Sequence, residues 1–301
     1  MTTPTSASNT LTLRTNLQDY PVTMAIKDGR VTSSLVKLNC CGPKVAHNGF
    51  KDLLRNDKFD ASELAIVTYL QAKAYGKPWV LIPAPVHGRQ QHHCAGYNIE
   101  LGEMKPKDIE GRLVGVRTYA QTTGLWIRGI LQHEYGVDLE KVTYLTVDEG
   151  HLAEYRDPPN CRRLSPGSDI GAMMLKGEVA AALMGNDLPK DPRVRTLIPK
   201  PHKAAQRWFE REGVVPINHL FVVHADIAKR RPEVVREIFR MLVEARNFAP
   251  AEAVKDLPPL GYEANRKGID LAIQWAFEQK IIPRRFNVDE LFDDTTASLN
   301  I

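Results

Sequence analysis

The chain has 301 residues, of which 43% are hydrophobic and 25% are charged. These proportions are typical of a water-soluble globular protein, and the length favours two lobes of ordinary domain size over one small core. The formal net charge of +4 comes from short basic clusters that lie far apart in the sequence. We therefore expect no nucleic acid as a partner. No hydrophobic run approaches the ~20 residues that span a bilayer, so we expect no membrane partner either.

The N-terminal segment and the cysteines indicate in which cellular compartment the protein is found. The first ten residues are polar, begin with Met1 and lack the basic and hydrophobic regions of a secretory signal. The four cysteines, Cys40, Cys41, Cys94 and Cys161, show no CxxC spacing, which argues against a zinc module and a disulfide framework. We therefore expect a cytoplasmic protein.

Hydrophobic patterning along the chain alternates between strands and helices. The predicted strands cover residues 11–17, 79–83, 142–145, 179–184, 194–198 and 214–223. The predicted helices cover residues 49–54, 66–75, 169–177, 203–212 and 232–245. Residues 86–94 and 157–168 read as loops, the second of them long enough for a lid. The alternation indicates the α/β fold class.

Residues 113–131 form the most informative segment. A short hydrophobic run predicts a buried strand. A polar turn that contains Thr, Gln and Thr follows, and hydrophobic residues then recur at helical spacing. A helix that starts there, with Thr122 or Thr123 as its cap, leaves free backbone N–H groups at the carboxyl edge of a parallel sheet. Such a site favours a carboxylate or a phosphate. The alternative is an ordinary strand–helix unit whose turn is solvated.

Four segments, in their order and approximate spacing, resemble the 4,5-dihydroxyphthalate decarboxylase family. They are residues 59–64 (FDASEL), 89–93 (RQQHH), 122–131 (TTGLWIRGIL) and 216–219 (PINH). The third is the most specific, and the resemblance extends over roughly residues 11–245. Two places depart from the family pattern. Gln91 and His92 stand where an aromatic residue and an arginine are usual, and the segment 178–181 (EVAA) lacks the expected aspartate.

That family in turn resembles the type 2 periplasmic binding proteins, which implies a two-lobed α/β fold with an interlobe cleft. Residues 1–110 would form the first part of lobe 1, residues 111–216 lobe 2, and residues 217–301 the remainder of lobe 1. The chain would cross between the lobes near residues 107–112 and 214–220.

The resemblance implies a decarboxylase that acts on a hydroxylated aromatic or heteroaromatic (di)carboxylic acid. Loss of CO2 is easiest when the ring carbon is protonated while a hydroxyl group is deprotonated, and histidine is suited to both transfers. His93 and His219 are the catalytic candidates, with Glu63 as a third. The alternatives are a solvated loop for His93, a buried backbone-bonded ring for His219 and a helix-start carboxylate for Glu63.

A small aromatic carboxylate is the expected partner, and cationic and polar side chains are expected to hold it. The substrate-binding candidates are Arg89, His92, Thr122, Thr123, Trp126, Arg128 and Asn218. Arg128 lies one turn into a hydrophobic helix, so it could equally face solvent or brace the interface between the lobes. For Trp126 the alternative, packing in the core, is the stronger expectation.

No cofactor is expected, with a divalent metal held by His87, His92 and His93 as the alternative. The competing function is a solute-binding protein for a small organic anion, which would need the cleft and Arg89 but neither catalytic histidine. Cys40 and Cys41 suggest a third class, a pyrimidine-synthase type of enzyme that uses pyridoxal phosphate or iron. Assembly into a homo-oligomer is left open.

Overall fold

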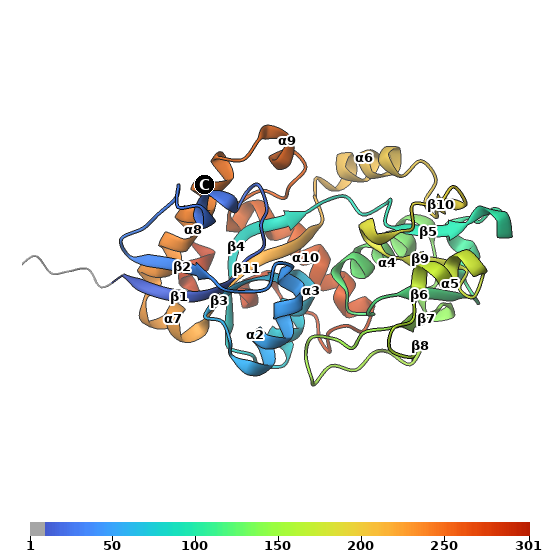
Figure 1. Ribbon diagram of the computed structural model, residues 1–301, viewed down its shortest axis with the longest axis horizontal. Helices are drawn as coiled ribbons and strands as arrows, with labels where there is room; N and C mark the ends of the chain where they lie inside the picture. Colours follow the sequence, from blue (N-terminus) through green and yellow to red (C-terminus); the bar gives the residue numbers. More distant parts are fainter. Residues whose placement is uncertain (1–9) are drawn as a thin grey trace, which may run out of the picture.

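The computed structural model describes residues 10–301 and consists of two halves, each built around a mixed β-sheet (Figure 1). The first sheet contains β1 (Leu11–Asn16), β2 (Val36–Cys40), β3 (Ala61–Ala65), β4 (Trp79–Gly88) and β11 (Ile217–His224). Their order is β2-β1-β3-β11-β4, and β11 runs antiparallel to both of its neighbours. β3 is buried along its whole length, as is expected of a central strand packed on both faces.

The second sheet is built from shorter strands. They are β5 (Ala95–Asn98), β6 (Leu113–Val116), β7 (Thr143–Thr146), β8 (Cys161–Arg163), β9 (Ala181–Leu183) and β10 (Val194–Thr196). Their order is β10-β5-β9-β6-β7-β8, in which β9, β6, β7 and β8 are parallel. The carboxyl ends of these four strands therefore lie along one edge of the sheet, where α/β proteins bind ligands.

Helices cover both sheets. The longer ones are α2 (Phe50–Asn56), α3 (Ile66–Ala74), α4 (Thr122–Tyr135), α5 (Ile170–Lys176), α6 (Pro201–Glu212), α7 (Ala225–Arg230), α8 (Pro232–Asn247) and α10 (Tyr262–Glu278). The shortest are α1 (Met24–Lys27), α9 (Ala251–Val254), α11 (Asp294–Ala297) and the 3-10 turns η1 (Ala46–Gly49), η2 (Ile99–Leu101), η3 (Pro106–Ile109), η4 (Leu139–Lys141), η5 (Gly185–Asp187) and η6 (Val288–Leu291). Within residues 10–301, no helix combines the length and the hydrophobicity needed to cross a membrane.

The chain passes between the halves twice, and the two passages lie side by side. The first, residues 89–94, joins β4 to β5, and the second, residues 213–216, joins α6 to β11. Arg89 N donates to Pro216 O at 3.1 Å, and Gln91 Nε2 donates to Asn218 Oδ1 at 2.7 Å. Because β5 pairs within the second sheet, the first passage precedes the expected one at residues 107–112. The expected return near residue 217 coincides with the start of β11.

α10 joins the two halves through a shared hydrophobic core. This helix contacts both α3 in the first half and α4 in the second (Figure 1). The Trp275 ring lies edge-on to Trp126 at 5.4 Å, and Trp126 Nε1 donates to Ile217 O at 2.9 Å. The largest cluster of buried hydrophobic residues is therefore continuous across both halves. No element was predicted beyond residue 245, so this connection was missed.

Candidate functional site

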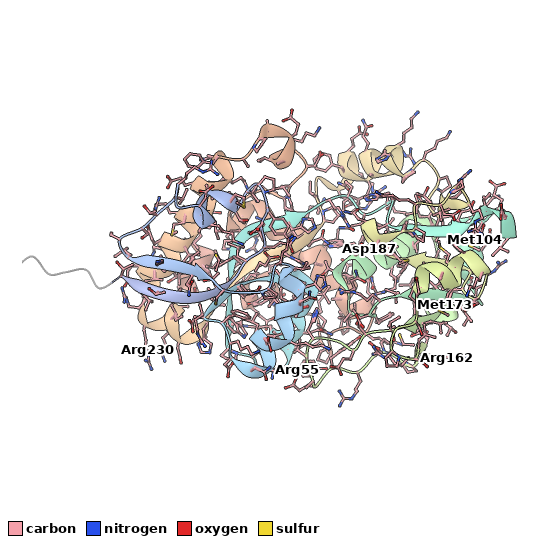
Figure 2. All side chains as sticks on the ribbon, viewed as in Figure 1. Arg55, Met104, Arg162, Met173, Asp187 and Arg230 are labelled. Atoms are coloured by element: carbon pink, nitrogen blue, oxygen red, sulfur yellow. The ribbon has the colours of Figure 1, made fainter. Side chains whose placement is uncertain are left out.

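A cleft of about 480 Å³ lies between the two halves, and the ends of strands from both sheets line it. Its walls are formed by Gln18, Tyr20, Val45, His47, Phe50, Ala65, Thr68, His87, Arg89, Arg117, Ala120, Gln121, Thr122, Thr123, His151, Met184, Gly185, Asn186, Asp187, Asn218 and His219. Asp187, which follows β9, lies near the middle of the molecule where the halves meet (Figure 2). Four of these residues are histidines, which brings several ring nitrogens that can hydrogen-bond a ligand into one cleft.

His219 and Glu63 form the most ordered pair in the cleft. His219 Nδ1 lies 2.7 Å from Glu63 Oε1, and the Glu63 side chain is fully buried on β3. The same carboxylate accepts from Tyr20 Oη at 3.0 Å and from the Gln18 backbone N at 2.7 Å. Since an ionised carboxylate only accepts, Nδ1 of His219 carries the hydrogen and Nε2 is left for a ligand.

His87 lies beside this pair on β4. Its ring stacks on Tyr20 at 5.3 Å and meets His219 edge-on at 5.6 Å. Burial, with smaller contributions from the charges of His219 and Arg89, lowers the pKa of His87 to about 3. His87 is therefore neutral near pH 7 and presents one donor and one acceptor nitrogen.

The other two histidines of the cleft are His47 and His151. His47 Nε2 lies 3.0 Å from Arg117 Nη1, and His151 Nδ1 lies 2.9 Å from Thr68 Oγ1. A guanidinium only donates, so His47 Nε2 is the acceptor and this ring is neutral. Burial, followed by the charge of Arg117, lowers the pKa of His47, and the same causes lower the pKa of His151 to about 3.

The start of α4 lines the cleft. The first main-chain bond of this helix runs from Leu125 N to Gln121 O, so the preceding N–H groups are free to bind a ligand. Arg89 and Arg117 line the same cleft, and Arg89 Nε is buried with no hydrogen-bond partner in the described part of the chain. A helix start beside two guanidinium groups favours a carboxylate or another small anion.

Several of the predicted site residues do meet at this cleft. Arg89, Thr122, Thr123, Asn218 and His219 line it, and Glu63 lies behind His219. They were identifiable because they lie at or near strand ends, where side chains from parallel strands converge.

His93 and His92 lie elsewhere, contrary to the prediction. His93 borders a separate cavity of about 440 Å³, where its ring stacks on His202 at 6.3 Å. The His92 side chain is 1% exposed and packs edge-on against Trp208 at 6.0 Å. The reason is local: β4 continues to Gly88 and the chain then turns into the first passage, so neither ring lines the cleft, although His93 lies beside Arg89 and Asn186 of its wall.

Trp126 and Arg128 are structural as well, which corrects their assignment as ligand contacts. Both are fully buried in α4. The Arg128 guanidinium donates to Gln279 Oε1 at 2.9 Å and to Tyr119 O at 2.7 Å, and it lies over the Tyr119 ring at 3.9 Å. Arg128 therefore braces the contact between α4 and the end of α10, the alternative that the sequence had left open.

The three histidines of the metal alternative do not converge either. His87 packs on Tyr20, His92 on Trp208 and His93 on His202. Residues 10–301 contain no group of three or more histidine, cysteine, aspartate or glutamate side chains arranged to hold a metal ion.

Many residues of the cleft were not predicted, among them Tyr20, His47, Arg117 and His151. Arg117 directly follows β6, so the argument from strand ends that found Thr122 also pointed to it. His47 and His151 lie in a 3-10 turn and a loop, for which the hydrophobic pattern carries no signal.

Comparison with known proteins agrees with the resemblance read from the sequence. No protein-family model matches the chain. The chain is 26% identical over 197 residues to the 4,5-dihydroxyphthalate decarboxylase of Comamonas testosteroni, a match that covers 59% of this chain and 58% of that protein. It is 24% identical over 174 residues to the 4,5-dihydroxyphthalate decarboxylase of Pseudomonas putida, covering 52% of this chain and 65% of that one. The matches thus span less than two thirds of each relative.

Solved structures identify the fold. The periplasmic aliphatic sulphonate binding protein SsuA from Escherichia coli superposes with a TM-score of 0.61 at 12% identity, covering 94% of this chain and 92% of that one. The chain therefore has the two-lobed α/β fold of periplasmic binding proteins, with the cleft between its lobes. At this identity the likeness concerns the fold alone.

Proposed function

We propose that the chain is a decarboxylase of a hydroxylated aromatic or heteroaromatic carboxylic acid, similar to 4,5-dihydroxyphthalate. The observation that carries the proposal is the His219–Glu63 pair, held at 2.7 Å in the same cleft as two arginines and the start of α4. The names of the two relatives support the same chemistry.

The reaction needs a proton at the ring carbon that carries the leaving carboxylate. Direct loss of CO2 would leave a localised aryl anion, whereas protonation of that carbon, with a hydroxyl group ortho or para to it deprotonated, avoids this intermediate. We assign proton transfer to His219, because Glu63 fixes its ring and compensates for the positive charge that the ring acquires with a second proton. Such a positioned transfer contributes about 10²–10⁴-fold in rate.

His87 takes the place beside the substrate hydroxyl that the sequence had given to His93. It acts there as a hydrogen-bond acceptor and not as the final base, so the hydroxyl proton passes on to water. The His87 ring lies 5.6 Å from that of His219 and is neutral, so it can accept a hydrogen bond from the substrate hydroxyl. Arg89, Arg117 and the free N–H groups of α4 would hold a carboxylate at the other end of the cleft.

The second candidate function is the capture of a small organic anion as a solute-binding protein. The likeness to an aliphatic sulphonate binding protein favours it. A binding protein would use the helix start and Arg89, but it would not require a buried carboxylate to orient a histidine.

Release of CO2 from a panel of hydroxylated aromatic mono- and dicarboxylic acids, including 4,5-dihydroxyphthalate, tests the proposal. The assay is run with EDTA and with added divalent cations, so that a metal requirement is detected. For the active acid, His219→Gln should lower kcat by about 10²–10⁴-fold while the dissociation constant changes little. Arg89→Ala should instead raise KM, because it removes a contact already made in the ground state.

Thr122→Ala is the mild control, because the backbone N–H groups of α4 remain in place. A solute-binding protein predicts another pattern, in which acids bind without CO2 release and His219→Gln changes affinity alone. If no acid in the panel binds or releases CO2, both functions are rejected.

A further inference from the structure

A side compartment of about 380 Å³ opens next to the cleft, on the side of the second sheet. Four residues line both spaces: Arg117, Gln121, Met184 and Asp187. The compartment thus adjoins the cleft across these four residues and lies at the same carboxyl edge of β6, β7 and β9.

The floor of the compartment is hydrophobic. Ile170 and Leu183 are buried, Val147 and Met184 are half-buried, and all four line the space. Ile170, Val147 and Met184 also belong to, or pack on, the small hydrophobic cluster of the second sheet. The floor is therefore the accessible surface of a packed hydrophobic cluster, made by several side chains and not by one.

Three carboxylates surround this floor: Asp148, Asp169 and Asp187. Asp169 caps α5 by accepting from Ala172 N at 3.0 Å. Arg117, which lines both spaces, offsets one of these three negative charges. The remaining negative charge disfavours a second anionic group in the compartment, in contrast to the free N–H groups at the start of α4 in the cleft.

The size of the two spaces also bears on the ligand. The cleft alone, at about 480 Å³, lies within the range that holds a whole small-molecule ligand. A single aromatic ring with its carboxylates and hydroxyls would leave the adjoining 380 Å³ unfilled.

We propose that the side compartment is a specificity subsite that binds an uncharged hydrophobic substituent of the substrate. This inference rests on the proposed function only in taking an aromatic acid as the ligand. The ring and its carboxylate would lie in the cleft, and the substituent would pass between Arg117 and Met184 onto the floor formed by Ile170 and Leu183. The preferred substrate class is accordingly a hydroxylated aromatic acid with an alkyl side chain.

Calorimetric titration with matched ligands tests the subsite. Hydroxybenzoates carrying a butyl group at each free ring position are compared with the unsubstituted parent, and with analogues whose chain ends in a carboxylate. Each buried methylene should strengthen binding about fourfold, so one butyl isomer should bind at least about tenfold more tightly than the parent. The carboxylate-ended analogue should gain nothing.

Two filling variants locate that gain. Val147→Trp and Ser168→Trp each place a large ring in the compartment, and neither residue belongs to the proposed proton-transfer or carboxylate-binding groups. Both should abolish the advantage of the butyl ligand and leave the affinity for the parent acid within about twofold. Leu101→Trp, at a side chain that is 61% exposed on the surface, is the matched control and should change neither affinity.

The outcomes separate this inference from the proposed function. Equal binding of the parent and every butyl isomer, or a gain that survives in a correctly folded filling variant, overturns the subsite even if CO2 is released. A gain lost in the filling variants supports the subsite even if no CO2 appears. If Val147→Trp does not fold, Ser168→Trp decides. If neither the parent nor any derivative binds, the subsite is rejected together with the aromatic acid ligand.

Discussion

Glu63 is a buried carboxylate with both oxygens engaged, Oε1 by His219 and Tyr20 and Oε2 by the Gln18 backbone. Glu63→Gln keeps the shape but replaces one acceptor oxygen with an amide donor, which leaves the His219 ring without a compensating charge. We expect kcat to fall by about 10²–10⁴-fold with a small change in KM. Steady-state kinetics on the active acid measures both constants.

Tyr20→Phe is the graded control for this prediction. It removes one hydrogen bond to Glu63 Oε1 and leaves the contact with His219 in place. A much smaller loss of kcat is expected from it. If the two variants lose the same activity, the charge of Glu63 is not what supports His219.

His92 offers a test of stability against pH. Its side chain is 1% exposed, and burial, followed by the charges of His93, Arg207 and Arg211, lowers its pKa to about 4. An unfolded histidine titrates near 6.5, so between about pH 6.5 and 4 the unfolded chain holds a proton that the native state lacks. Stability should therefore fall as the pH falls through this window, by up to about 1.4 kcal/mol per pH unit from this residue.

His92→Phe should flatten that dependence. The variant keeps a ring against Trp208, and the replaced Nδ1 has no hydrogen-bond partner within residues 10–301. Urea unfolding at several pH values between about 7 and 5 measures the slope. Equal slopes for the variant and the wild-type protein would mean that native His92 binds the proton after all.

Among single residues, the sequence correctly identified those that lie on or near the ends of predicted strands. Glu63 lies on β3 and His219 on β11. These two strands pair with each other, so the proximity of the two residues follows from the order of strands in the sheet. His93 could not be placed in the same way, because the direction of its ring depends on where β4 ends and the passage begins.

The contact between α4 and α10 depends on a glycine. A Cβ atom on Gly129 would lie 1.9 Å from Trp275 Cε3, so the two helices approach too closely for any side chain there. Gly129→Ala should therefore destabilise the protein by about 1–3 kcal/mol, because the large Trp275 ring must move within a packed core. Thermal or urea unfolding measures the change.

Gly268→Ala is the matched control in the partner helix. There the nearest atom to a Cβ is Val214 Cγ1 at 3.4 Å, which is ordinary contact. Because alanine lowers the entropy of the unfolded chain, this variant should be stabilised by about 0.5–1 kcal/mol. Equal effects of the two substitutions would show that helix propensity, and not the contact with Trp275, governs both positions.

The elements show where hydrophobic patterning is sufficient. The helix predicted over residues 66–75 is observed as α3, and the strand over 11–17 as β1. The strand predicted over 79–83 continues to Gly88 in spite of Pro83 and Pro85. Proline is tolerated there because β4 is an edge strand, and its pairing with β11 is irregular at Pro85. A sequence does not reveal which strand will lie at an edge.

The whole molecule is joined by more than its two passages. The contact between Gly129 and Trp275 links residues far apart in sequence. Through it, α10 packs against both lobes and belongs to the core of each. The two-lobed fold was predictable from the family resemblance. The shared core was not, because it depends on where the C-terminal segment docks.

A second connection between the lobes borders the cleft. Residues 148–156, which we call the strap, follow β7 of lobe 2 and reach α2 and α3 of lobe 1. Arg55 on α2 donates to the carbonyl oxygens of Gly150 and His151 at 2.9 and 2.8 Å, and its side chain lies on the lower edge of the molecule in Figure 2. Because His151 also lines the cleft, the strap is the part of the wall that joins lobe 2 to lobe 1 through polar contacts.

Opening of the cleft should therefore release the strap before the α4–α10 contact. The strap is held by polar contacts and by only two buried hydrophobic side chains, Leu152 and Tyr155, whereas α4 and α10 each bury many residues in the shared core. In hydrogen exchange, amides of residues 148–156 should become protected when 4,5-dihydroxyphthalate or another bound acid fills the cleft, whereas those of α4 should be protected throughout.

Arg55→Ala should speed exchange of the unliganded strap by roughly fivefold, since it removes about 1 kcal/mol of hydrogen bonding. Arg285→Ala, which breaks an exposed ion pair with Asp270 on α10, should leave the strap unchanged. Protection of α4 that rises with ligand as strongly as that of the strap would mean that the lobes separate at α10 instead.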